Sequence, residues 1–175
     1  MKLSTLATVL FTMLSGCFKN ETKGPVLAVG ATAPAVEGTD GTGNRVALGR
    51  PDRNAYVVYF YPKDDTPGCT KEACSFRDDY SVYEKAKIDV FGVSRDDEKS
   101  HETFRAHHKL PFVLVSDESG AIQQSYGVPS KMGMPARITF LIDKDKKVVK
   151  VWEDVTPANH ASDVIGAART LGLVP

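Results

Sequence analysis

Two cysteines separated by four residues, Cys69 and Cys74, are the side chains of this chain best suited to covalent chemistry. Cys69 follows a loop rich in proline and aspartate (residues 62–68) and begins a stretch whose apolar residues recur at helical spacing. We therefore expect Cys69 in the first turn of a helix, where unpaired N–H groups and the helix dipole stabilise a thiolate. The thiolate is the nucleophilic form of cysteine. A small buried residue on the apolar face of the helix is the alternative that position alone leaves open.

The segments around this pair alternate between strands and helices. We predict a hairpin at 36–48, strands at 55–61, 88–94, 112–116, 137–143 and 147–152, and helices at 69–86, 97–109, 118–126 and 159–171. This order predicts an α/β sandwich with a mixed central sheet and helices on both faces. The helix that begins at Cys69 then starts at the carboxyl edge of a central strand, where α/β folds place their sites.

Composition limits the possible functions. The 175 residues suffice for one domain, expected from Ala31 to Pro175. Lys+Arg and Asp+Glu both number 22, which argues against a nucleic-acid partner. Three cysteines are too few for a disulfide scaffold or an all-cysteine zinc site. We interpret the four histidines as surface residues without metal-ligand spacing: His101, His107, His108 and His160.

The N-terminus has the features of a secretion signal. The apolar run at residues 3–14 would span about 18 Å as a helix, short of the roughly 30 Å hydrocarbon core of a bilayer. The sequence Leu-Ser-Gly-Cys at 14–17 resembles the lipobox of bacterial lipoproteins, which implies removal of residues 1–16 and lipid on Cys17. Residues 17–30 would then be a tether, and the protein would be anchored by lipid to a membrane of the bacterial cell envelope, on its periplasmic or external face. An ordinary signal peptide with a chance cysteine is the alternative.

The loop before Cys69 carries a more specific resemblance. The pattern Pro62-x-x-x-Thr66-x-x-Cys69 resembles the active-site signature of peroxiredoxins, and residues 60–78 are similar to the bacterioferritin-comigratory (peroxiredoxin Q) branch. Weaker similarity extends over most of residues 31–175. The resemblance implies a thioredoxin-like fold and a thiol-dependent peroxidase that reduces hydrogen peroxide and organic hydroperoxides. It implies no metal, haem or flavin cofactor, and regeneration by a thioredoxin-like or other dithiol reductant.

The resemblance also assigns roles to individual residues. Cys69 matches the peroxidatic cysteine, which becomes a sulfenic acid, and Cys74 matches the resolving cysteine. Thr66 matches the threonine that positions thiolate and peroxide, and Pro62 the proline that shields the pocket from water. Arg137 matches the distal arginine that polarises the peroxide, a task that suits its fixed charge and several donors.

The spacing of the two matched cysteines has a structural consequence. In an ideal helix their Cα atoms would lie roughly 8.6 Å apart, whereas a disulfide needs about 4.4–6.8 Å. A bond between Cys69 and Cys74 therefore requires the first turns of the helix to unwind, which predicts a redox-driven order–disorder switch.

Some assignments stay open. Glu72 either orients an arginine (Arg137 or Arg77) or is an exposed helix residue, and Arg77 has the same ambiguity. A Sco-like copper-binding lipoprotein, with Cys69, Cys74 and His160 as ligands, is the main alternative function, although that class uses C-x3-C spacing. A disulfide reductase would need C-x2-C. We expect a monomeric enzyme.

Overall fold

The computed structural model describes residues 24–40 and 42–174. The predicted signal peptide and Cys17 lie outside these residues. Within the described ranges, no helix combines the length and the apolar character needed to cross a bilayer.

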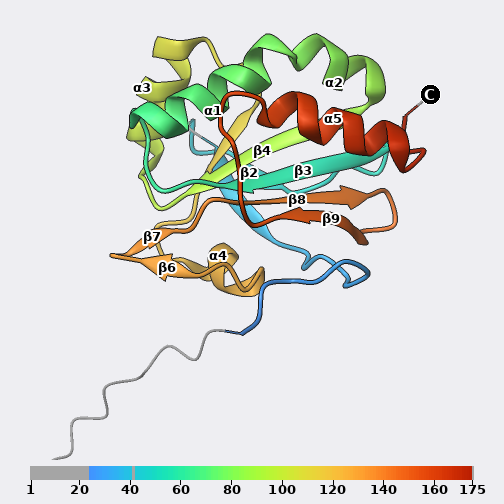
Figure 1. Cartoon of the computed structure of the whole chain (residues 1–175). Coiled ribbons are helices and arrows are strands. Elements are labelled where there is room, and N and C mark those ends of the chain that lie inside the picture. Colours follow the sequence, from blue (N-terminus) through green and yellow to red (C-terminus); the bar gives the residue numbers. More distant parts are fainter. Residues whose placement is uncertain (1–23, 41, 175) are drawn as a thin grey trace, which may run out of the picture.

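A mixed sheet of seven strands forms the centre of the described chain, in the order β2-β1-β5-β4-β3-β8-β9 (Figure 1). The strands are β1 (Glu37–Asp40), β2 (Arg45–Ala47), β3 (Ala55–Phe60), β4 (Ile88–Ser94), β5 (Val113–Ser116), β8 (Ile138–Asp143) and β9 (Val148–Trp152). Strands β3, β4 and β5 run parallel, whereas β8 is antiparallel to β3 and β1 is antiparallel to β5. The predicted α/β sandwich with a mixed sheet is confirmed.

The helices cover the two faces of the sheet unequally (Figure 1). One face carries α1 (Pro67–Asp78), α2 (Tyr80–Ala86), α3 (Glu98–His108) and α5 (His160–Thr170). The other carries the short α4 (Ala121–Ser125) and a hairpin of β6 (Ser130–Lys131) and β7 (Met134–Pro135). All six residues of β3 are buried because both faces of the sheet are covered. Alternate β3 side chains therefore enter the two separate cores.

Three elements differ from the predictions. The helix expected at 69–86 begins at Pro67, which fits the first helical position because proline lacks the N–H that would be unpaired there. It divides at Asp79 into α1 and α2. The helix expected at 118–126 is shorter, because Gly120 adopts a left-handed conformation with φ 76° immediately before α4. The β6–β7 hairpin was not predicted; its turn residues, Met132 and Gly133, both have positive φ.

Packing against the domain begins before Ala31, within the segment assigned to the tether. The Leu27 N–H donates to the Tyr126 carbonyl at 3.1 Å, and the Gly30 N–H donates to the Val148 carbonyl at 2.8 Å. Only glycine fits at position 127, because a Cβ there would lie 2.1 Å from the carbonyl oxygen of Pro25. The backbone of Pro25 therefore lies directly against Gly127. Residues 25–30 therefore lie on the face that carries α4.

Candidate active site

Cys69 lies in the first turn of α1, as predicted, and only 2% of its surface is exposed. Thr66, in extended conformation, immediately precedes the helix, so Cys69 is its third residue. The helix follows the carboxyl end of β3 after the loop 61–66. The sulfur is therefore placed at the edge of the sheet, among the unpaired N–H groups of a helix N-terminus.

The register of the strands places Arg137, 68 residues after Cys69 in the sequence, next to the Cys69 sulfur. Because β3 and β8 are antiparallel with Phe60 opposite Ile138, residue 137 lies beside the start of the loop that leads to Cys69. Arg137 Nη2 donates a hydrogen bond to Cys69 Sγ at 3.2 Å. Gly68 leaves room for this approach, because a Cβ at that position would lie 3.3 Å from Nη2. The structure thus brings Cys69 and Arg137 together.

Glu72 is the carboxylate that holds Arg137 in place. It lies one turn after Cys69, is completely buried, and forms a short ion pair with Arg137 Nη1. Burial raises the pKa of Glu72 to about 7, although Arg137 opposes the rise. The guanidinium therefore contacts a carboxylate and the Cys69 sulfur at once. Glu72 therefore contacts Arg137 and not Arg77, and the alternative of an exposed glutamate is wrong.

Arg77 lies further along α1, beside Cys74 and away from Cys69. Its guanidinium binds the Asp78 carboxylate and donates to the backbone oxygen of His108 at 3.0 Å. No described contact joins it to Glu72 or Cys69, so it is not the arginine that Glu72 orients.

His160 lies beside Glu72, although the sequence interpretation placed it on the surface and gave it a role only in the copper-binding alternative. It is 1% exposed, with Nε2 2.7 Å from Thr139 Oγ1 and 3.9 Å from Glu72 Oε1. Burial first, and then the charge of Arg137, lowers the pKa of His160 to about 4, so the ring is neutral at pH 7. The prediction of a surface residue is wrong for His160, and equally for His101, which is fully buried. Spacing does not separate His101 from the exposed His107, because each lies three residues from the buried Phe104. His160 did carry a signal, since it lies at helical spacing with the buried Val164 and Ala168.

The buried Asp64 carboxylate holds the loop between β3 and α1 through several hydrogen bonds. This carboxylate accepts hydrogen bonds from Tyr61 Oη and Ser100 Oγ, both at 2.8 Å, and lies 2.9 Å from His101 Nδ1. Within the same loop, the Thr66 hydroxyl donates a hydrogen bond to the Lys63 carbonyl at 3.0 Å. Pro62 is half-buried in the same loop. These contacts tie the loop to α3.

Cys74 is half-buried on the same helix as Cys69, and both are free thiols. Among the described side chains, Cys69, Cys74 and His160 do not form a group with metal-ligand separations. The copper-binding alternative therefore has no ligand set here.

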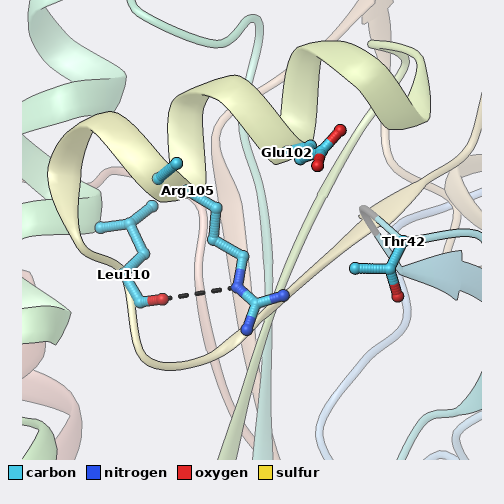
Figure 2. Close-up of a pocket in the computed structure, with 5 residues that line it drawn as sticks. Thr42, Glu102, Arg105 and Leu110 are labelled. Atoms are coloured by element: carbon cyan, nitrogen blue, oxygen red, sulfur yellow. Dashed lines mark hydrogen bonds between the residues drawn. The ribbon is translucent and has the colours of Figure 1, made fainter.

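A separate hollow of about 310 Å³ lies between α3 and the β1–β2 turn (Figure 2). Its lining consists of Thr42, Glu102, Arg105, Ala106 and Leu110. Arg105 Nε spans part of it to reach the Leu110 carbonyl at 3.4 Å. It contains none of the residues around Cys69, so the chemistry of the thiol is not located there.

Comparison with known proteins identifies the family. The model of the AhpC/TSA family matches residues 29–151. The chain belongs to the AhpC/TSA family. Over 145 residues it is 39% identical to the chloroplastic peroxiredoxin Q of Suaeda salsa, covering 81% of this chain and 68% of that protein. Over 147 residues it is 39% identical to a putative peroxiredoxin bcp of Coxiella burnetii, covering 80% of this chain and 97% of that one.

Comparison with solved structures supports the same family. The chain is similar, with a TM-score of 0.74 and 33% identity, to the Xanthomonas campestris bacterioferritin comigratory protein, whose structure was reported for alkyl peroxide reduction activity. The match covers 85% of this chain and 99% of that one. The protein is therefore a peroxiredoxin with a thioredoxin-like fold, a thiol-dependent peroxidase of the oxidoreductase class. The Sco-like alternative is not favoured.

Replacing Glu72 is expected to change how the stability of this peroxiredoxin depends on pH. The pKa of Glu72 is about 7 in the folded chain against an ordinary 4.5, so the folded chain binds more protons between these values and stability falls as pH rises. His160, lowered from 6.5 to about 4, acts with the opposite sign in an overlapping window. Glu72→Gln removes the first contribution only.

The free energy of unfolding of Glu72→Gln should therefore rise relative to that of the wild type by about 2 kcal/mol between pH 5 and 7.5. Urea titrations of both proteins across this range measure the difference, and Glu102→Gln, at an exposed position of α3, is the control. A difference independent of pH would show that Glu72 does not titrate in this window.

Proposed function

We propose that Cys69 is the peroxidatic nucleophile and that Arg137, held by Glu72, activates both the thiolate and the peroxide. The observation that carries the proposal is the Arg137 guanidinium in contact with the Cys69 sulfur and the Glu72 carboxylate together. The thiolate attacks one peroxide oxygen with its electron pair, and the O–O bond breaks. Cys69 becomes a sulfenic acid, and the departing oxygen leaves as alkoxide or hydroxide, which takes up a proton. The positive charge of Arg137 stabilises that oxygen as its charge develops.

Thr66 and Pro62 complete the peroxide pocket in this proposal. Because the Thr66 hydroxyl donates its proton to the Lys63 carbonyl, its oxygen is left as an acceptor for the O–H of a hydroperoxide. Pro62, at the start of the loop, limits the access of water. The pocket would admit hydrogen peroxide and organic hydroperoxides, in keeping with the alkyl peroxide reduction named for the Xanthomonas campestris relative.

Cys74 is the proposed resolving cysteine. Its thiolate attacks the sulfenic sulfur of Cys69, the S–O bond breaks, and water leaves after proton uptake, so that an intramolecular disulfide forms. A thioredoxin-type dithiol donor then reduces this disulfide and is itself oxidised. We propose that the enzyme acts as a monomer.

Peroxide titration tests this function. The Cys17→Ser chain carries thiols only at Cys69 and Cys74, which makes thiol counting unambiguous. One equivalent of hydrogen peroxide should consume both thiols rapidly and yield a Cys69–Cys74 disulfide by mass spectrometry. Copper uptake without peroxide consumption would instead support a copper-binding protein.

Disulfide formation is expected to unwind the first turns of α1. Both cysteines lie within α1, so their Cα atoms are separated by roughly 8.6 Å of helix, beyond the reach of a disulfide. Oxidation should reduce the far-UV circular dichroism signal of helix and accelerate amide hydrogen exchange at residues 69–78. Residues 98–108 of α3 provide the internal control. Equally slow exchange at 69–78 in both forms, with the disulfide present, would contradict the expected unwinding.

We also propose that the chain is lipidated at Cys17 and attached to a membrane of the bacterial cell envelope. The support is the sequence Leu-Ser-Gly-Cys at 14–17 after a short apolar run. Residues 1–16 would be removed, and residues 17–24 would link the lipid to residues 25–30, which pack against the peroxidase domain. The neutral charge balance gives no reason to expect a nucleic-acid partner.

Cys17→Ser is expected to leave the protein unprocessed or to release it from membranes, because the serine hydroxyl cannot take the place of the modified sulfur. Fractionation of cells and intact mass of the product measure this, with Cys74→Ser as a control that leaves the lipid site unchanged. A processed Cys17→Ser chain that still fractionates with membranes would contradict the lipoprotein proposal.

A further inference from the structure

Three metal-ligating side chains gather at the surface where α3 ends beside the loop that precedes α1. They are Asp65, His107 and His108, and their ligand atoms all lie within 4.8 Å of one another, a grouping found nowhere else among residues 24–40 and 42–174. His108 lies 43 positions after Asp65 in the sequence. The fold alone brings the carboxylate to the two imidazole rings.

The separations suit a metal ion. His108 Nε2 lies 2.7 Å from Asp65 Oδ1, and His107 Nδ1 lies 3.8 Å from the same oxygen. Two ligand atoms about 2.1 Å from a tetrahedral ion lie roughly 3.4 Å apart. The measured distances lie on either side of this value, so shifts of about 1 Å would complete the geometry. The exposed side chains of His107 (69%) and Asp65 (49%) have the freedom to make them.

The surroundings also favour a cation. His107 and His108 form the last turn of α3, where the helix dipole presents partial negative charge. Neighbouring residues of a helix point about 100° apart, yet these two rings have centroids 4.4 Å apart and meet at one carboxylate. The nearby Arg77 guanidinium is engaged by the Asp78 carboxylate and the backbone oxygen of His108.

We propose that Asp65, His107 and His108 bind one divalent transition-metal ion such as Zn²⁺, with water at the remaining positions. Two imidazole nitrogens and one carboxylate oxygen form a ligand set suited to Zn²⁺, Co²⁺, Ni²⁺ or Fe²⁺. Mg²⁺ and Ca²⁺ prefer oxygen ligands and are poor candidates. The ion joins the loop before α1 to the end of α3.

This link has a consequence for the catalytic cycle, which depends on the proposed function. Asp65 immediately precedes Thr66, whose carbonyl accepts the first hydrogen bond of α1, from the Thr70 N–H at 2.8 Å. An ion that holds Asp65 against α3 stabilises the folded start of α1. It therefore slows formation of the Cys69–Cys74 disulfide, which needs unwinding, and leaves attack on peroxide unchanged.

Binding is tested in the full chain with all three cysteines replaced by serine, so that no thiol binds zinc. Calorimetric titration with Zn²⁺ at pH 7.5 should show one ion per chain. Asp65→Asn, His107→Gln and His108→Gln should each weaken affinity at least about tenfold, and Glu102→Gln, an exposed carboxylate on the same helix, should leave it unchanged. Asparagine keeps the side chain short and tolerates the φ of 53° at position 65. Equal affinity in the three variants, or no saturable binding, would overturn the site.

The consequence is tested by quenched-flow mass spectrometry of the Cys17→Ser chain with one equivalent of peroxide. Zn²⁺ should slow disulfide formation severalfold without changing sulfenic acid formation, and His107→Gln should abolish this effect. If Zn²⁺ slows sulfenic acid formation and disulfide formation equally, in the parent chain and in His107→Gln, the inhibitory ion is bound at the thiolates. That result would overturn the proposed link. Zinc-free protein that neither consumes the peroxide nor loses its thiols would instead contradict the proposed function and leave the binding result standing.

Discussion

Cys69→Ser is expected to abolish peroxide reduction, with a loss on the order of 10³-fold or more. A serine hydroxyl at this position stays protonated at neutral pH and lacks the polarisable sulfur that accepts oxygen from the peroxide. Peroxide consumption measured with excess dithiol reductant gives the rate. Near-normal turnover in Cys69→Ser would exclude Cys69 as the nucleophile.

Cys74→Ser should behave differently and is the matched variant. The first step needs only the Cys69 thiolate, so one equivalent of peroxide should still be consumed at the wild-type rate. The sulfenic acid then has no partner in the chain, and excess peroxide should convert Cys69 irreversibly to sulfinic acid, detected as a gain of two oxygens. A small external thiol that attacks the sulfenic acid would restore partial turnover. A normal cycle in Cys74→Ser with a dithiol donor alone would contradict the resolving role.

Arg137→Met is expected to slow peroxide reduction by about 10²-fold, the usual effect of removing one preorganised donor from a site of developing negative charge. Methionine fills much of the space of the arginine stem but offers no charge to the sulfur or to the departing oxygen. Stopped-flow measurement of peroxide consumption gives the rate of the chemical step. Alkylation of Cys69 by iodoacetamide at pH 7 should slow in parallel, because the thiolate loses its hydrogen-bond donor.

Two further variants separate chemistry from folding. Arg137→Lys keeps the charge but cannot contact Glu72 and Cys69 at once, and should give an intermediate loss. Arg45→Met removes an arginine whose side chain is 81% exposed, and should leave the rate unchanged. Because Arg137→Met leaves Glu72 buried without its partner, thermal melts must show a folded protein at the assay temperature. A near-normal rate and normal alkylation in folded Arg137→Met would remove Arg137 from the site.

Local patterns in the sequence were sufficient for the secondary structure around the site. The run 55–61 of β-branched and aromatic residues predicts β3 to within one residue, because a strand covered on both faces needs apolar side chains at every position. The loop rich in proline and aspartate marks the start of α1 and the place of Cys69. These features depend on neighbours in the chain, so they can be read without a fold.

Contacts between distant segments depended on tertiary structure. The partner of Glu72 lies 65 residues away and is set by the antiparallel register of β3 and β8. His160 is buried because α5 packs beside α1, and its ring lies against Phe76. His107 and His108 meet Asp65 only because α3 ends next to the loop before α1. Burial of a titratable side chain depends on which face of its helix packs against the rest of the fold. The sequence by itself therefore determined the candidate nucleophile and its helix, and only the packing of the helices on the sheet decided which charges surround them.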